Sequence, residues 1–131
     1  MPEIVEGKIA FPPPTGLGVH SDKLQSHPRQ IKQMVRALLK SHDFIRTRKN
    51  DTVKIVTNWL KVDNAVATGS YDAFYSSMSP QGWMTEPFTE AVIDQLGQSL
   101  KVSDKVLAAR VVDFTIVKDV FGESTRTPAA R

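Results

Sequence analysis

Apolar residues recur at helical spacing through the stretch that begins at Pro28. They occupy positions 31, 34, 35, 38, 39 and 45, the pattern of a helix that buries one face. Proline is favourable at a first helical position, because its missing N–H would have no partner there. The pattern therefore predicts a long amphipathic helix from Pro28 to about Asn50, with its apolar stripe facing the core.

Shorter amphipathic segments flank this helix, and most of them follow a residue that favours a helix N-cap. A turn is indicated by Ser79-Pro80-Gln81-Gly82, because proline and glycine stop regular structure. The expected caps and helices are Ser21 before 22–25, Asn50 or Asp51 before a helix to Leu60, Asp63 before a helix to about Tyr75, Thr85 before a helix to Leu96, Ser103 before a turn to Leu107, and Asp113 before 114–121.

The N-terminal part has a different pattern. The run Phe11-Pro12-Pro13-Pro14 disfavours a helix, because each proline lacks a donor and pushes its predecessor toward extended geometry. We expect one extended strand over residues 12–19, with Gly16 and Gly18 allowing a bend or a close backbone approach. The predicted fold is mainly α: an array of short amphipathic helices preceded by one extended strand. Residues 1–11 form a lead segment, 12–121 the domain, and 122–131 a flexible tail.

Composition bounds the class of protein. With 131 residues, 40% of them hydrophobic and 24% charged, the chain fits one ordinary domain. No apolar run approaches the length that spans a bilayer, so no membrane insertion is expected. The first ten residues do not have the pattern of a signal peptide. Without cysteine, the chain offers neither a disulfide nor a thiolate.

Charge is unevenly distributed. Residues 21–49 carry a net charge of +6, which leaves −3 for the rest of a chain whose total is +3. Basic side chains together with Gln30 and Gln33 leave a small nucleic-acid binder as one alternative. A solvated helix face explains the same charges more simply, and the remainder of the chain is negative.

Candidate chemistry is sparse. His20, His27 and His42 are scattered without the spacing of metal ligands or of a nucleophile and its base, and Gly16-Leu17-Gly18 lacks the rest of a phosphate loop. We therefore expect no catalytic residue, metal or cofactor, and no enzyme. Four aromatic residues at helical spacing are expected in the core, and a fifth, Trp83, stands in the glycine-containing loop. The four are Trp59, Tyr71, Phe74 and Tyr75.

Two longer runs carry a resemblance to a known family. Residues Pro14 to Pro28 and Val35 to Ile45 resemble the C-terminal part of solute-binding proteins of ABC importers, in the branch that takes sulfonates, nitrate, taurine and thiamine precursors. Shorter matches occur at Asn50-Asp51, at Ser79 to Gly82 and at Val112 to Phe114. The resemblance covers residues 12–121, and it is the order and spacing of the motifs that carry it.

The resemblance implies a two-lobed α/β fold that closes on a solute about a hinge. Residues 12–19 then correspond to a hinge-crossing strand, and Thr15 and Gly16 are the candidate ligand-binding positions at the cleft edge. Most of both lobes, and most of the cleft, lie before this strand in the family. The implied partners are those lobes or a partner chain, the importer permease and a small organic solute, in a periplasmic or extracytoplasmic location. Related thiamine-precursor enzymes share the fold, but none of their catalytic residues matches a position here.

Three functions follow as hypotheses. The first is a partial solute-binding component that does not hold its ligand by itself. The second is a stand-alone helical interaction module that forms homo-oligomers through its exposed apolar surface. The third is the small basic nucleic-acid binder.

Overall fold

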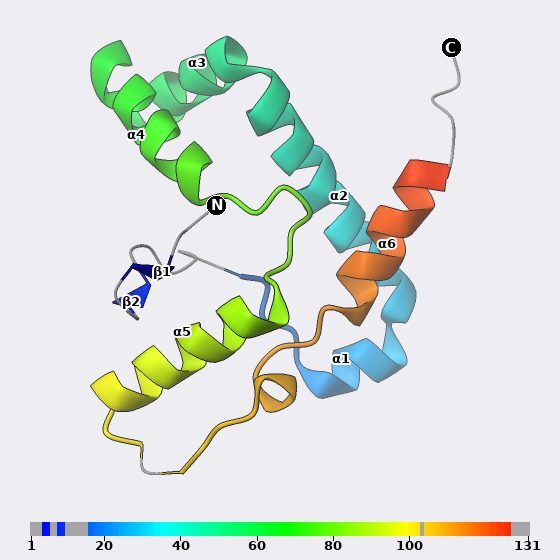
Figure 1. Ribbon diagram of the computed structural model, residues 1–131. Coiled ribbons are helices and arrows are strands. Elements are labelled where there is room, and N and C mark those ends of the chain that lie inside the picture. The colour runs from blue at the N-terminus through cyan, green and yellow to red at the C-terminus, as the bar shows by residue number, and fades with distance from the viewer. Residues whose placement is uncertain (1–3, 6–7, 10–15, 103, 127–131) are drawn as a thin grey trace.

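The computed structural model of the chain describes residues 4–5, 8–9, 16–102 and 104–126, and this part is mainly helical, as predicted (Figure 1). One short antiparallel ladder pairs β1 (Ile4–Val5) with β2 (Lys8–Ile9). The helical elements are α1 (Ser21–Ser26), α2 (Pro28–Thr47), α3 (Lys49–Leu60), α4 (Asn64–Ser77), α5 (Glu86–Ser99), the 3-10 helix η1 (Ala108–Arg110) and α6 (Thr115–Arg126).

The long helix ends earlier than the sequence pattern predicts. α2 stops at Thr47, where the N–H of Arg48 donates to the carbonyl of Phe44 at 2.9 Å. The carbonyl of Arg48 then accepts from the N–H of Thr52, also at 2.9 Å, which opens α3. The predicted cap at residues 50–51 is therefore wrong, because the chain turns two residues sooner and both positions lie inside α3.

Three other predicted capping residues lie at helix starts, whereas Ser21 is the first residue of α1, which His20 caps. The carboxylate of Asp63 accepts from the N–H of Val66 at 2.8 Å and caps α4. Asp113 accepts from the N–H of Thr115 at 2.8 Å, at the start of α6. Thr85 is the N-cap residue of α5, although its side chain makes no capping bond. Side-chain acceptors thus fix two of these helix starts.

The ends of the chain differ from expectation. Of the predicted strand, residues 12–15 lie outside the described part, and residues 16–20 carry no regular secondary structure. α6 continues through Gly122 to Arg126, so residues 122–126 of the predicted tail are helical, and residues 127–131 lie outside the described part. Ser103 lies outside the described residues, and the short helix in this region is η1 rather than a turn ending at Leu107.

The best-packed part of the molecule is the hairpin of α3 and α4, which lie side by side (Figure 1). Val53 from α3 packs with Ala67 and Tyr71 from α4, and Ala67 is fully buried. The hydroxyl of Tyr71 donates to the carbonyl of Ile45 at 2.7 Å, near the end of α2. This bond satisfies a buried phenol and ties the hairpin to the long helix.

A second contact joins α2 to α6, which run alongside each other (Figure 1). Val120 of α6 is 1% exposed. Lys32 pairs with Asp119 at 3.6 Å, and Arg36 hydrogen-bonds Glu123. Polar pairs on one side of an apolar seam therefore align the two helices.

Several apolar side chains that the sequence pattern assigns to the core are exposed. Trp59 is 79% exposed, and Met34 and Leu38 of the α2 stripe are also largely open. Tyr71 is buried as expected, whereas Phe74 and Tyr75 are partly open. The spacing correctly identifies a helical stripe in each case, but the structure places no second surface over all of it.

Candidate binding cavity

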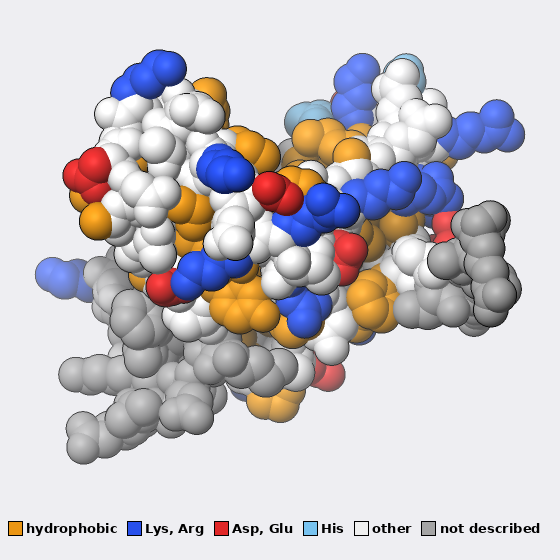
Figure 2. All heavy atoms as spheres, turned by 90° about the horizontal axis from the view of Figure 1, so that it is seen from above, with side chains coloured by type: hydrophobic (Ala, Val, Ile, Leu, Met, Phe, Trp, Pro, Cys, Tyr) orange, Lys and Arg blue, Asp and Glu red, His pale blue; other side chains and the backbone are white. Residues whose placement is uncertain are grey.

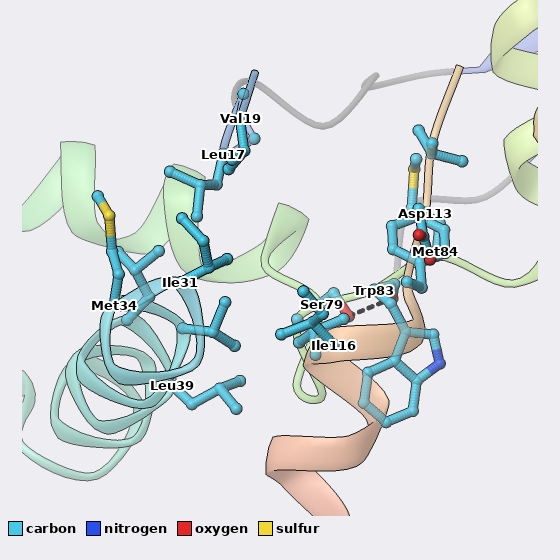
Figure 3. Close-up of a pocket in the computed structure, with 18 of the residues that line it drawn as sticks. Leu17, Val19, Ile31, Met34, Leu39, Ser79, Trp83, Met84, Asp113 and Ile116 are labelled. Carbon is cyan, nitrogen blue, oxygen red and sulfur yellow. Dashed lines mark hydrogen bonds between the residues drawn. The ribbon is translucent and has the colours of Figure 1, made fainter. Parts of the chain in front are cut away.

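An open cavity of about 910 Å³ lies beside α2. Its walls come from residues 16–19, from one face of α2, from the end of α4 with the following loop, and from the segment between η1 and α6. Figure 3 shows Ile31 and Met34 on α2 at one side, and Met84 and Ile116 at the other. Elements far apart in sequence thus form one site.

The walls are mostly apolar. Leu38 and Val35 line the α2 side, and Phe114 and Val117 the opposite side. Three methionines also contribute: Met34, Met78 and Met84. Methionine side chains are flexible and polarizable, so walls of this kind adapt to the shape of an apolar guest.

Gly82 fixes how closely the loop approaches the two helices. Its φ is +85°, a conformation that favours glycine. A Cβ at this position would lie 3.0 Å from Leu39 of α2 and 3.4 Å from Val117 of α6. The turn predicted from Ser79 to Gly82 is present, with the N–H of Gly82 donating to the carbonyl of Ser79 at 3.3 Å. Glycine is therefore needed here for both backbone conformation and space.

Trp83 is held between the loop and α6. Its ring meets the ring of Phe121 edge to face, with centroids 5.2 Å apart, and it lines the cavity. Its carbonyl accepts from the hydroxyl of Ser79 at 2.6 Å (Figure 3). The tryptophan that sequence reasoning left unassigned thus combines packing with a place in the wall.

Few polar groups reach the cavity. Burial, together with the charge of Arg46, lowers the pKa of His42, so its imidazole is neutral near pH 7. Hydrogen bonds from Thr115 lower the pKa of Asp113, which stays ionised. Arg110 of η1 is exposed and also lines the cavity. Arg110 and Asp113, two residues of opposite charge, therefore belong to the same stretch of wall.

The two candidate positions from the sequence have different outcomes. Gly16 lines the cavity, and Thr15 lies outside the described residues. The structure does not bring the three histidines together: Nδ1 of His20 lies 3.5 Å from Asp22, and His27 is hydrogen-bonded to Ser26. In the described part of the chain, no group of three or more His, Cys, Asp or Glu side chains is placed to hold a metal ion.

Sequence reasoning missed much of the wall. Val111, Val112 and Ile116 were not recognised as wall residues, and no pattern in the sequence connects them with the face of α2. Met78 and Met84 flank the predicted turn, where helical periodicity does not extend. Only the folding of that turn against α2 and α6 brings them to the site.

Basic side chains are distributed rather than gathered. Figure 2 shows Lys and Arg side chains spread over one face, with acidic and apolar side chains between them. Across the α2 and α6 contact, Lys32 and Arg36 are partnered by Asp119 and Glu123. Among the described residues, no helix is long and apolar enough to cross a membrane.

Comparison of the chain with protein-family models, with curated proteins and with solved structures finds no match in any of the three.

Proposed function

We propose that the chain is a helical part of the solute-binding component of an ABC-type importer for small organic solutes, and that it requires further protein surface to hold its ligand. The resemblance of residues 12–121 suggests the class. The need for a partner is inferred from the exposed apolar surface at the tip of the α3–α4 hairpin.

That surface consists of large side chains near the turn between the two helices. Ile55 and Trp59 stand four residues apart and so share one face of α3. Both are more than half exposed, as are Leu60 and Val66 at the adjoining ends of α3 and α4. Exposed apolar groups of this size favour association, because covering them removes apolar area from water.

The residues that line the cavity support the proposal that the chain needs further protein surface to hold its ligand. A small polar anion such as taurine or nitrate needs several donors that converge on it. Arg110 and His42 are the cavity's basic side chains among the described residues, and the imidazole is neutral near pH 7. The described residues of the cavity wall therefore lack the donor set that tight binding of such solutes requires.

The test uses the complete chain and a separately expressed two-lobed remainder of a solute-binding protein of this type. We expect the two to form a complex by size-exclusion chromatography, and the double substitution Ile55→Ser with Trp59→Ser to weaken it at least tenfold. Val102→Ser, at an exposed apolar residue outside the hairpin, is the matched control. Isothermal titration of the chain alone with taurine and ethanesulfonate should show no submillimolar binding. Such binding, or the absence of a complex, would overturn the proposal.

Self-association is the second candidate, and the exposure of Trp59 favours it too. In that case sedimentation velocity gives a concentration-dependent dimer that the Ile55→Ser, Trp59→Ser chain does not form. A clean monomer across the micromolar range, with no binding of an apolar dye, rules it out. The two candidates are distinguishable, because only the first predicts a complex with the two-lobed remainder.

A further inference from the structure

We propose that the cavity beside α2 binds one long-chain fatty acid, with the acyl chain between α2 and the η1–α6 segment and the carboxylate at Arg110. This inference does not depend on the function proposed above. It rests on the size of the cavity, on the nature of its walls and on the presence of Arg110 among the described lining residues.

Size and wall chemistry suit an acyl chain. The volume of 910 Å³ falls within the range of about 300–1,000 Å³ common for small-molecule sites. Leu38 of α2 and Val111 beside η1 line the cavity and are 39% and 56% exposed, so apolar surface is open to a guest. Methionines on both sides, Met34 and Met84, let the wall follow a bent chain (Figure 3).

The head group follows from the charges at the wall. Arg110 has no ion-pair partner within 4.0 Å among the described residues, and its planar guanidinium matches a carboxylate with two parallel hydrogen bonds. Asp113 carries a negative charge and is held by Thr115.

The chain's tryptophans provide a direct measurement. There are two, Trp59 and Trp83, and only Trp83 lines the cavity. In a Trp59→Phe background, Trp83 becomes the single donor for energy transfer to cis-parinaric acid. We expect saturable transfer at one ligand per chain, displaced by palmitate below its micelle concentration.

Two variants separate the acyl site from the head-group site. Met34→Glu should weaken both palmitate and hexadecanol at least tenfold, whereas Leu96→Glu, at an exposed residue outside the cavity, should change neither. Arg110→Gln should weaken palmitate by roughly tenfold and leave hexadecanol unchanged, because a charge-assisted pair is lost only with the carboxylate. Lys118→Gln, which removes a cation from α6 outside the cavity, is its matched control.

Circular dichroism of each variant ensures that a loss of binding is not a loss of fold. Absence of energy transfer from Trp83 in the folded Trp59→Phe chain would overturn the proposal. Palmitate binding that Met34→Glu leaves intact would place the ligand elsewhere and overturn it as well. Equal weakening of palmitate and hexadecanol by Arg110→Gln would refute the assigned head-group contact.

Discussion

The α3–α4 hairpin and the α2–α6 pair are built from similar amphipathic helices but are packed differently. In the hairpin, Ala67 is small enough for α3 and α4 to approach closely, and Tyr71 fills the space beside it. Beside the α2–α6 pair, the loop at Gly82 enters between the helices and leaves an open cavity. A small and a large residue on one face of α4 pack with Val53 of α3 and close the first contact, whereas the α2–α6 pair has an open cavity beside it.

The electrostatic links of the two regions also differ. In the hairpin, Lys49 pairs with Asp72 at 2.5 Å and lies 5.3 Å from the Tyr71 ring centroid, directly over the packed core. Along α2 and α6, the pairs Lys32–Asp119 and Arg36–Glu123 hold the outer edge of a contact whose other edge is open. We infer that the buried core of the hairpin contributes more to stability than the walls of the cavity do.

The largest expected effect distinguishes the two regions by one substitution to alanine in each. Tyr71→Ala removes a buried ring and should lower the free energy of unfolding by about 3–5 kcal/mol, as for other large-to-Ala changes in cores. Leu38→Ala, at a 39% exposed cavity wall, should cost less than about 1 kcal/mol. Urea denaturation followed by far-ultraviolet circular dichroism measures both. Equal losses would contradict the assigned difference between the regions.

A smaller effect is expected at the start of α4. Asp63→Ala removes the side-chain acceptor for the N–H of Val66 and should destabilise the chain by about 1 kcal/mol. Asp63→Asn, which retains a capping oxygen, should restore most of the loss. The measurement is the urea midpoint of each variant. If Asp63→Ala is neutral, the cap does not contribute to the stability of the hairpin.

The effect of pH on stability through His42, at the cavity, should be smaller than the effect of removing the α4 cap. The pKa of His42 is lowered from 6.5 in the folded chain, so the unfolded chain binds the proton more readily. Stability is therefore complete above about pH 6.5 and falls as the pH drops toward the lower folded pKa. Because His42 is partly exposed, the loss should stay under about 1 kcal/mol. His42→Gln should make the urea midpoint change less between pH 7 and pH 5. If the midpoint still changes with pH as in the unsubstituted chain, His42 is not the cause of the pH dependence.

The smallest effect is expected at the outer edge of α2 and α6. The hydrogen bond from Arg36 lowers the pKa of Glu123, so this carboxylate stabilises the fold above its ordinary pKa of 4.5. That contribution is lost as the pH falls through the lower folded value. Glu123→Gln should lower the thermal midpoint slightly at pH 7 and make no difference at strongly acid pH. The difference should also shrink in high salt, because exposed charges are screened; a salt-independent difference would argue against an ionic origin.

Sequence reasoning correctly predicted the helical character of the chain and several of its helix caps and turns. The α2 stripe, the caps at Asp63 and Asp113 and the turn before Gly82 all depend on local chemistry, and the structure contains each of them. The break between α2 and α3 was predicted at Asn50 or Asp51 and lies two residues earlier, at Arg48, where no proline or glycine marks it.

The candidate site was less predictable. Gly16 was nominated from a resemblance and lies at the cavity, but Met84 and Val117 had no signal that connected them to it. Trp59 was expected in a core because its spacing matches a helix. Spacing defines a face of a helix and does not specify whether another element covers that face.

The sequence by itself determined where most helices form, because periodicity, capping and turn residues act over a few neighbouring positions. Only the tertiary structure decided which apolar faces are covered. It placed α4 against α3 and left the wall of α2 open beside Gly82, since burial depends on contacts between residues far apart in the chain. Those contacts form the cavity and place Arg110 in its wall.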